Sequence, residues 1–299
     1  MEFKPELKVV TERGDLGREF FQLLLAVELS GSLKGASEAL KVPYSTAWNT
    51  VARAERILGV KIVEASKRGG TTLTDRGREL LRRYMAEAGK MGLVLGLSDF
   101  IYAGSHDPIV EAALQRSEAY FVGSMRGLLL VSEGLAHFGG IHLGDNVQAV
   151  RIYGGGLRLI HGFKREVGVA SRRELRRLRD IVGLKIVNRQ PGSGTRLHID
   201  RVLSTLRLTP EKVPGYDRIA PTHDEAARIV AEGEADYTIT LRYVAERYGL
   251  YFMKLWDEEF DFVCRRGLER RVAQFVRELE LGPGYAPKPN MGRVEPTIK

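Results

Sequence analysis

Three short turns in the second half of the chain place hydroxyl groups where helices are expected to begin. They are Gly104-Ser105-His106-Asp107-Pro108, Gly123-Ser124-Met125-Arg126-Gly127 and Gly192-Ser193-Gly194-Thr195-Arg196. The first N–H groups of a helix have no partner within it and carry partial positive charge, so they attract anions. Glycine lets the backbone approach closely, and Ser or Thr adds a hydroxyl donor. The three turns together predict a binding site for an anion.

The expected ligand is a tetrahedral oxyanion rather than a nucleotide. The turn that starts at Gly192 lacks the Gly-Lys-Ser/Thr ending of a phosphate-binding loop and the glycine spacing of a dinucleotide-binding turn. Nearby arginines could neutralise a dianion, and Thr222 opens a fourth turn of the same kind. The predicted ligand contacts are Ser105, His106, Ser124, Met125, Arg126, Arg189, Ser193, Gly194, Thr195, Arg196, Tyr216 and Thr222. For each Ser or Thr, the alternative is a purely structural helix cap.

The residue pattern predicts no catalytic centre, metal site or cofactor. The six histidines show no metal-ligand spacing. His106-Asp107 resembles a phosphohydrolase dyad, but the other ligands of such a site are missing. No nucleophile–base pair or carboxylate pair stands out. We therefore expect a binding protein and not an enzyme.

A second set of polar residues, near the N-terminus, fits the recognition of DNA. Ser32 can cap a helix rich in small residues. The turn Lys41-Val42-Pro43 ends this helix, and a further helix is expected to begin at Tyr44. Small residues and a short turn let two helices cross closely, as in a helix-turn-helix. Short polar side chains on the further helix suit base edges, and the basic Gly-rich hairpin that follows suits phosphates. The expected DNA contacts are Ser32, Lys34, Ser45, Thr46, Asn49, Arg53, Lys67 and Arg68, whereas Trp48 is expected in the core.

These two sets of residues fall into different domains. A chain of 299 residues predicts two or three domains. We expect a mainly helical winged helix-turn-helix at 1–74, a linker helix at 75–97, an α/β domain at 98–280 and an irregular tail at 281–299. After residue 98, short apolar runs alternate with amphipathic helical patterns, which predicts βα units around a largely parallel sheet.

Composition and one apolar stripe indicate which kinds of partner the chain is expected to bind. The net charge of +8 favours polyanions or anionic ligands. The single cysteine, Cys264, allows no internal disulfide, and no signal-peptide pattern or membrane-length apolar run is present. A cytoplasmic protein without a membrane partner is expected. The expected linker helix has an apolar stripe too long for a small winged domain to cover, which predicts a homodimer or higher homo-oligomer. The stripe comprises Leu80, Leu81, Tyr84, Met85, Ala88 and Met91.

The N-terminal segment resembles a known family of DNA-binding domains. The stretch GSLKGASEALKVPYSTAWNTVARAERILGVKIVEASKRGGTTLTDRG looks like the winged helix-turn-helix of LysR-type regulators. It most closely resembles the ModE family of molybdate-responsive regulators, although the small β sensing module of that family is not evident. The resemblance implies that the linker helix pairs with its copy across a two-fold axis. The expected partner is then double-stranded DNA with a pseudo-palindromic operator.

The C-terminal segment resembles the PBP-like domain, a relative of periplasmic solute-binding proteins for molybdate and tungstate. The matching stretches are GSHDP, VGSMRGLLLVSEG, GGIHLGD, IVNRQPGSGTR, PGY, THDEAARIVAEGEAD and YGLYFMKLWDEEFDFVC. The resemblance implies a type II architecture of two α/β lobes, with molybdate or tungstate as effector in the cleft. The run Asp236-Tyr237-Thr238-Ile239-Thr240 is bulkier than in relatives and is expected to reshape that cleft, and His198 stands where relatives tend to be apolar.

Two hypotheses from different classes follow. The first is a transcriptional regulator that senses molybdate or tungstate and controls genes of molybdenum and tungsten homeostasis. The alternative is a non-regulatory enzyme or carrier of molybdenum-cofactor metabolism that binds a cofactor precursor. The winged helix and the lack of a catalytic pair favour the regulator.

Overall fold

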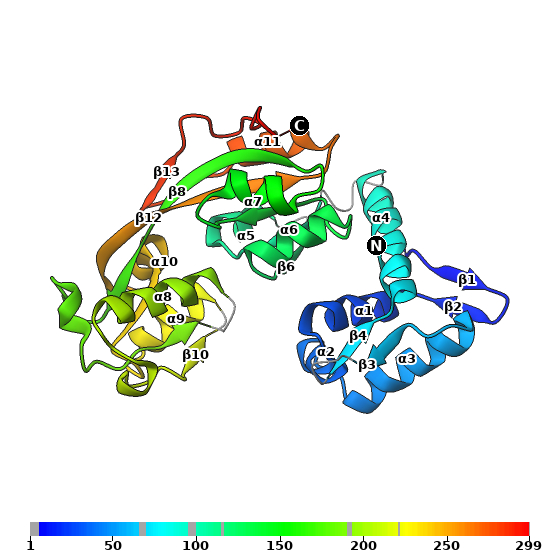
Figure 1. The fold of residues 1–299 in the computed structure, drawn as a ribbon, viewed down its shortest axis with the longest axis horizontal. Coiled ribbons are helices and arrows are strands. Elements are labelled where there is room, and N and C mark those ends of the chain that lie inside the picture. Colours follow the sequence, from blue (N-terminus) through cyan, green and yellow to red (C-terminus); the bar gives the residue numbers. More distant parts are fainter. Residues whose placement is uncertain are drawn as a thin grey trace, which may run out of the picture. The chain divides into compact units, whose positions relative to one another are not determined.

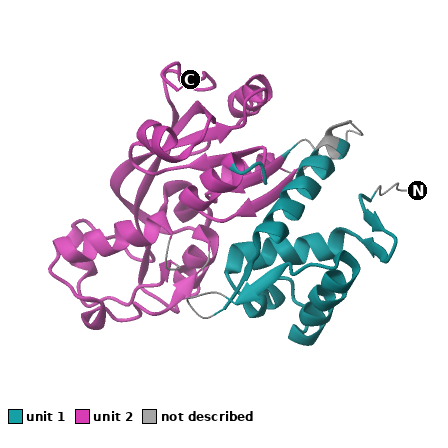
Figure 2. Cartoon of the chain, turned by 45° about the vertical axis from the view of Figure 1, so that its right-hand side comes forward, with its two compact units in different colours: residues 1–100, 133–135 teal, residues 101–132, 136–299 magenta. Residues whose placement is uncertain are grey.

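The computed structural model describes residues 6–65, 70–94, 100–114, 117–189, 193–220 and 222–298. The chain forms two compact units, residues 1–100 with 133–135 and residues 101–132 with 136–299 (Figure 2). Three parts of the sequence-based predictions lie outside the described residues: Lys67 with Arg68, residues 95–97 of the linker helix, and Gly192 of the third turn.

The described residues of the first unit form four helices and two short antiparallel strand pairs, which can be followed in Figure 1. In chain order these elements are β1 (Val9–Thr11), β2 (Gly14–Leu16), α1 (Arg18–Ser30), α2 (Leu33–Ala39), α3 (Tyr44–Leu58), β3 (Val63–Ala65), β4 (Thr71–Leu73) and α4 (Asp75–Val94). Helices α1 and α3 both end at a glycine, Gly31 and Gly59, with φ of +69°. Glycine is favoured there because a left-handed residue commonly ends a helix. Buried small residues at Ala36, Ala47 and Ala54 let the helices pack closely.

Helix α4 packs part of its apolar stripe within the chain itself. Leu81, Tyr84 and Met85 are buried, and the Tyr84 ring stacks on Phe21 of α1 with 3.6 Å between centroids. The stripe is therefore less free than the sequence suggested. Its half-buried members, Leu80, Ala88 and Met91, remain as candidates for contact with a second copy.

The second unit is an α/β structure of two lobes joined by a shared sheet, whose strands run in the order β11-β8-β12-β7-β5-β6. In the first lobe, β5 (Ile101–Gly104) lies parallel to both β6 (Glu118–Phe121) and β7 (Phe138–Ile141). Its helices are α5 (Pro108–Ala113), α6 (Ser124–Ser132), α7 (Asn146–Tyr153) and α11 (Glu269–Arg277).

The second lobe contains the parallel pair β9 (Asn188–Arg189) and β10 (Ile219–Ala220), together with β11 (Tyr237–Leu241). Its helices are α8 (Gly194–Thr205), α9 (His223–Ala231) and α10 (Arg242–Arg247), with short 3-10 turns at Leu178–Ile181 and Pro210–Lys212. A hydrophobic cluster of its own, which includes Val187, Ile199, Val230 and Ile239, stabilises this lobe.

Two long antiparallel strands connect the lobes, β8 (Arg158–Ser171) and β12 (Tyr251–Cys264). Each has 14 residues, a length of about 45 Å at 3.3 Å per residue. Residues 261–264 of β12 pair with β7 of the first lobe. Residues 167–171 of β8, at the other end of the strand pair, pair with β11 of the second lobe. Register shifts at 254/256 and 260/262 lie on either side of the midpoint and bend the pair there.

The segment after residue 280 differs from the expected irregular tail. It contains β13 (Tyr285–Pro287), which pairs with β8. Farther along, the N–H of His161 donates to the carbonyl of Arg293, and Ile298 is buried. Most of the described segment has neither helix nor strand, but backbone hydrogen bonds between residues 288–295 and β8 hold it against the sheet.

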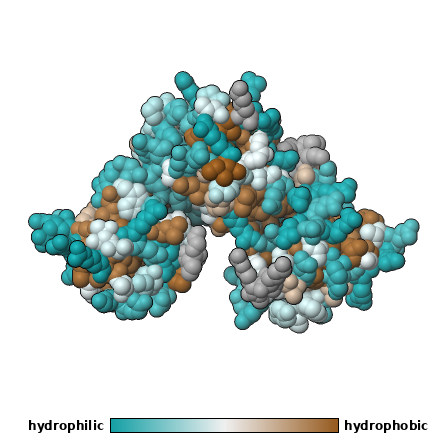
Figure 3. All heavy atoms as spheres, in the orientation of Figure 1, coloured by the Kyte–Doolittle hydropathy of each residue, from teal (hydrophilic) through white to brown (hydrophobic). Residues whose placement is uncertain are grey.

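The predicted fold class is confirmed: a winged helix-turn-helix precedes a two-lobed α/β unit. Hydrophilic residues cover much of the face shown in Figure 3, with hydrophobic residues in smaller groups between them. None of the helices within the described residues has the length and apolar character needed to cross a membrane.

Candidate functional site

One exposed face of α3 carries most of the residues expected to contact DNA. Ser45, Thr46, Asn49 and Arg53 are all on the accessible side of this helix, and none of them is buried. Positions 45, 46, 49 and 53 fall within about 100° of arc on a helix with 3.6 residues per turn. The structure therefore places these four predicted DNA contacts on a single surface.

Trp48 lies on the surface and not in the core, which corrects the sequence-based expectation. Its exposed fraction is 54%. The buried face of α3 is set by Ala47, Val51 and Ala54, and position 48 is about 100° away from position 47. Trp48 is thus a surface aromatic residue beside Asn49.

The remaining predicted DNA contacts are less uniform. Ser32 caps α2, because its Oγ accepts a hydrogen bond from the N–H of Gly35 at 2.9 Å. Lys34 is exposed in the first turn of that helix. A capping role explains the sequence signal at Ser32, and DNA contact by either residue stays a prediction.

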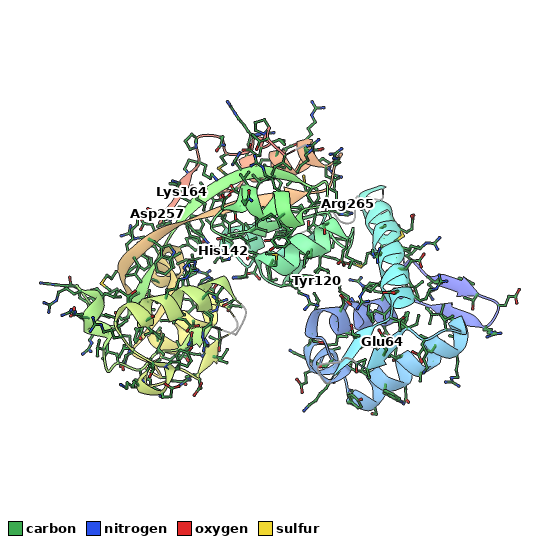
Figure 4. The ribbon with its side chains drawn as sticks, in the orientation of Figure 1. Glu64, Tyr120, His142, Lys164, Asp257 and Arg265 are labelled. Carbon is green, nitrogen blue, oxygen red and sulfur yellow. The ribbon has the colours of Figure 1, made fainter. Side chains whose placement is uncertain are left out.

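Two charged residues face each other where β8 and β12 pass from one lobe to the other. Arg165 and Glu258 are register partners, and Arg165 Nη2 lies 2.6 Å from Oε2 of Glu258. Figure 4 labels Lys164 and Asp257 on the same two strands. Burial alone would raise the pKa of the Glu258 carboxyl, but the charges and hydrogen bonds of His142 and Arg165 outweigh it and hold that pKa far below its usual value.

Arg165 also joins these strands to the start of α5. Its Nη1 lies 2.8 Å from Oδ2 of Asp107, and the hydroxyl of Tyr285 donates to the same oxygen at 2.8 Å. The other oxygen of Asp107 accepts from the N–H groups of Ile109 and Val110. The first N–H groups of α5 are therefore already bonded, which corrects the expectation that this helix start binds an external anion.

Three polar residues follow the three parallel strands of the first lobe at their carboxyl ends. Ser105 follows β5, Ser124 follows β6 and His142 follows β7. The hydroxyl oxygens of Ser105 and Ser124 are 2.7 Å apart, and the N–H of His142 donates to Ser124 Oγ at 2.9 Å. In open α/β sheets, ligands bind at this edge of the strands. The two predicted serines are thus brought together at the expected kind of position.

The second lobe presents its own carboxyl edge. Arg189 ends β9, and His223 comes three residues after β10. Both side chains are buried, with exposed fractions of 4% and 3%. Nδ1 of His223 lies 3.0 Å from Oγ1 of Thr240 on β11.

The two edges approach each other closely around His142 and His106. A methyl group built on Gly194, at the start of α8, would lie 2.7 Å from Cε1 of His142. Nδ1 of His142 also lies 2.9 Å from Oε1 of Glu258. Figure 4 shows His142 on the side of the first lobe that faces the second. The ring centroids of His106 and His223 are 6.5 Å apart. Glycine at position 194 therefore permits this approach of the lobes.

Burial and positive charge dominate the electrostatics between the lobes. Burial, reinforced by the charge of Arg165, lowers the pKa of Arg189 to about 10. Burial, with Arg189 and Arg165 next, holds the pKa of His223 well below its usual value, so its imidazole is neutral. Nδ1 of His106 is buried and has no hydrogen-bond partner among the described residues. A small anion placed here would meet cationic and neutral donors together.

Several predicted ligand residues serve other roles in the structure. Arg196 donates to the carbonyl of Arg189, stacks over Tyr216 at 4.2 Å and lies 3.3 Å from Asp200. The hydroxyl of Tyr216 bonds Asp200 as well. These contacts occupy Arg196 and Tyr216 within the second lobe.

The other turn residues are mostly caps or surface groups. Ser193 and Thr222 each accept a hydrogen bond from the backbone N–H three residues later. Thr195 is buried in the first turn of α8, whereas Met125 is exposed and Arg126 is half-buried in the first turn of α6. Ligand contact by these residues stays a prediction.

Tyr237 and Thr238 do not act as the sequence suggested. Tyr237 belongs to the hydrophobic cluster of the second lobe, and the hydroxyl of Thr238 donates to the carbonyl of Val187. Their bulk is absorbed by the packing of that lobe. Two positions later, the hydroxyl of Thr240 lies 3.0 Å from Nδ1 of His223.

Sequence reasoning missed the groups that join the lobes: His142, Arg165, His223 and Glu258. One signal was present for Arg165. It is a charged residue whose nearest neighbours on the same face of the strand, Phe163 and Val167, are apolar, and buried charges are rare unless paired. Glu258 stands in the acidic run DEEFD, where nothing marks it from its neighbours.

Comparison with known proteins relates both units to families. Residues 112–280 match the model of the PBP superfamily domain, and residues 19–78 match that of the bacterial regulatory helix-turn-helix proteins of the lysR family. A curated relative, the uncharacterized protein YvgK of Bacillus subtilis (strain 168), is 34% identical over 96 residues. That stretch covers 32% of this chain and 31% of YvgK, so the match spans about a third of the relative's length.

Two solved structures illustrate the similarity found by comparison with known structures. A hydrogen peroxide-bound mutant of OxyR from Corynebacterium glutamicum is 15% identical, with a TM-score of 0.45 over 87% of this chain and 90% of that one. The probable transcriptional regulator PA0477 from Pseudomonas aeruginosa is also 15% identical, with a TM-score of 0.45 over 88% of this chain and 97% of that one.

Proposed function

Because the chain belongs to the PBP superfamily and carries a helix-turn-helix of the lysR family, we propose that it is a DNA-binding transcriptional regulator with a small anion as effector. The helix-turn-helix reads duplex DNA through the exposed face of α3. The C-terminal unit binds the anion between its two lobes. The two activities lie in separate compact units, so the ligand acts on DNA binding indirectly.

The observation that carries the effector proposal is Arg189. Its side chain is almost fully buried, and burial together with Arg165 lowers its pKa to about 10, so its positive charge is held at an energetic cost. Arg165 lies between the carboxylates of Asp107 and Glu258. A bound anion would stabilise the Arg189 charge.

Neutral donors complete the proposed site. Ser105 and Ser124 offer hydroxyls from the first lobe. The start of α8, a helix of 12 residues, supplies backbone N–H groups beside Gly194. A tetrahedral anion has oxygens that can reach both lobes at once. Hydrogen bonds to a charged group contribute about 1.5–3 kcal/mol each.

The anion that we propose is molybdate or tungstate, on the strength of the sequence resemblance. Longer metal–oxygen bonds would let this ion, but not sulfate, reach donors on both lobes. Phosphate keeps a proton at neutral pH and needs an acceptor. The carboxylates of Asp107 and Glu258 already accept hydrogen bonds from Arg165, Tyr285 and His142, so they are poor acceptors for the proton of phosphate.

A homodimer completes the proposal. Paired helices α4 would place two α3 surfaces on successive turns of DNA and favour a pseudo-palindromic operator. Light scattering tests the dimer: a monomer at micromolar concentration, also with DNA present, would contradict it.

The effector is tested by thermal unfolding and calorimetry with molybdate, tungstate, sulfate, phosphate and chromate. A ligand at a hundredfold excess over its dissociation constant stabilises the folded state by about 2.7 kcal/mol. Arg189→Gln should abolish that stabilisation, whereas Arg173→Gln, which removes an exposed charge from the same lobe, should retain it. Folded protein that gives no heat with any of the five ions would end the oxyanion proposal.

The alternative function has a different signature. An enzyme or carrier of molybdenum-cofactor metabolism would turn over or bind a cofactor precursor without sequence-specific DNA binding. Selection of duplexes from a random pool separates the two functions. Failure to enrich any sequence, together with multiple turnover of a precursor, would reverse our preference.

A further inference from the structure

Three arginines of the first unit lie together at the C-terminal end of the recognition helix α3. Arg13, Arg53, Arg56 and Ile57 line a cavity of about 350 Å³. Arg53 and Arg56 come from the last two turns of α3, and Arg13 comes from the turn between β1 and β2. None of the three arginines is buried. Segments far apart in sequence thus bring three guanidinium groups around one cavity.

The β1–β2 hairpin is built against the end of α3. Gly14, with φ of +139°, packs on Ile57, because a methyl group there would lie 3.2 Å from Ile57 Cδ1. A methyl group on Gly59 would lie 3.3 Å from Nη1 of Arg13. The hydroxyl of Thr11 donates to the carbonyl of Gly14 and accepts from the N–H of Arg13, which orders the turn. Arg13 is therefore held beside the last turn of the helix by local structure.

The three arginines have no compensating charge in the described part of the chain. No carboxylate among those residues lies within ion-pair distance of Arg13, Arg53 or Arg56, whereas Arg78 on α4 pairs with Asp75 and Glu28. Like charges brought together on a surface repel one another. A cluster of this kind therefore favours an anionic partner.

The arginines continue the predicted DNA-reading face of α3. Positions 45, 49, 53 and 56 are separated by four, four and three residues, so they lie within about 80° of arc on one side of the helix. From position 45 to position 56 the helix rises about 16 Å. The major groove is about 12 Å wide. When Ser45 and Asn49 lie against base edges, Arg53 and Arg56 reach the phosphates at the edge of the groove.

We infer that Arg13, Arg53 and Arg56 form a phosphate-binding site for the DNA backbone where the recognition helix leaves the major groove. The inference rests on the proposed DNA-binding function and adds the β1–β2 hairpin to the DNA interface. Guanidinium groups suit this role because their planar donors match phosphate oxygens in pairs. Such contacts set orientation and affinity and do not read sequence.

The test is the salt dependence of binding to a short mixed-sequence DNA duplex and to a duplex selected from a random pool. Each lost phosphate contact lowers the slope of log affinity against log salt by about 0.9, which is about an eightfold loss at 0.1 M salt. Arg13→Gln should show that loss on both duplexes. Arg13→Lys, which keeps the charge, should retain most of the slope.

The matched control is Lys8→Gln on the same hairpin. The Lys8 ammonium already pairs with Glu6 and Asp15, at 3.4 Å and 3.5 Å, so its removal should change the slope less than Arg13→Gln does. Circular dichroism confirms that each variant is folded. The double variant Arg53→Gln, Arg56→Gln should lose about two contacts.

The outcomes separate this inference from the proposed function. If the unaltered protein binds neither duplex, the proposed function itself fails. If it binds both, and Arg13→Gln has the same affinity and slope as the unaltered protein, the phosphate-binding site is wrong. Loss of transcription activation in Arg13→Gln with unchanged DNA binding would instead assign the arginines to an acidic protein partner.

Discussion

Two groups of arginines, one in each unit, lie in opposite environments. On the helix-turn-helix, Arg13, Arg53 and Arg56 are accessible around an open cavity. Between the lobes, Arg165 is 1% exposed and lies between two carboxylates. A surface cation costs little to keep and is available to any polyanion, whereas a buried cation must be compensated when the protein folds. The same residue type is therefore available to a partner in one unit and supports the structure in the other.

The largest expected effect comes from breaking the buried pairing. Arg165→Met removes the partner of Asp107 and Glu258 together and leaves both carboxylates buried. Loss of one partner from a buried ion pair costs about 3–5 kcal/mol. Chemical denaturation should show that loss in the transition of the C-terminal unit. Arg173→Met, at an exposed position just after the end of β8, should stay within about 0.5 kcal/mol of the unaltered protein.

A smaller effect is expected at the start of α8. Thr195→Val keeps the shape of a buried side chain and removes one donor, so oxyanion binding should weaken by about 1.5–3 kcal/mol without unfolding. Calorimetry measures the change. Thr205→Val, at the exposed end of the same helix, is the control. Equal affinities for the two variants would remove Thr195 from the site.

On the DNA-reading face, Asn49→Ala should cost about 1–3 kcal/mol and relax sequence preference at one position. Lys67→Ala, which removes a predicted phosphate contact, should weaken binding to all sequences and flatten the salt dependence. Binding to a panel of single-base operator variants separates the two behaviours. If both variants lost affinity uniformly, the assignment of Asn49 to a base edge would be wrong.

The smallest effect concerns pH. The pKa of His223 is held well below its ordinary value near 6.5, so below that pH the unfolded chain takes up a proton that the folded chain does not. Stability should therefore fall as the pH drops from about 6.5, by up to about 1.4 kcal/mol per pH unit for this group. In His223→Gln the decline between pH 6.5 and 5 should be shallower by that amount. Unchanged slopes in urea denaturation series would show that His223 does not contribute.

The sequence was most informative where function depends on local patterns. The turn at Ser124, the glycine at 194 and the exposed polar positions of α3 could all be predicted, because helix starts and helical spacing are short-range features. Arg165 and Glu258 could not, because their pairing depends on the register of two strands 93 residues apart. Trp48 was misplaced since hydrophobicity alone does not say which face of α3 is buried. The order of the C-terminal segment depends on partners more than 100 residues away.

The crossover strands have a consequence for how this protein could be rebuilt. Ser171, the last residue of β8, and Tyr251, the first of β12, are register partners across the sheet. Residues 172–250, which lie between them in sequence, therefore leave the sheet and return to it at the same place. The second lobe is therefore an insertion into the antiparallel pair of β8 and β12, and it can be exchanged as one continuous segment. Exchanging it for the corresponding segment of another protein would replace one half of the proposed ligand site and leave the rest of the chain in its original order.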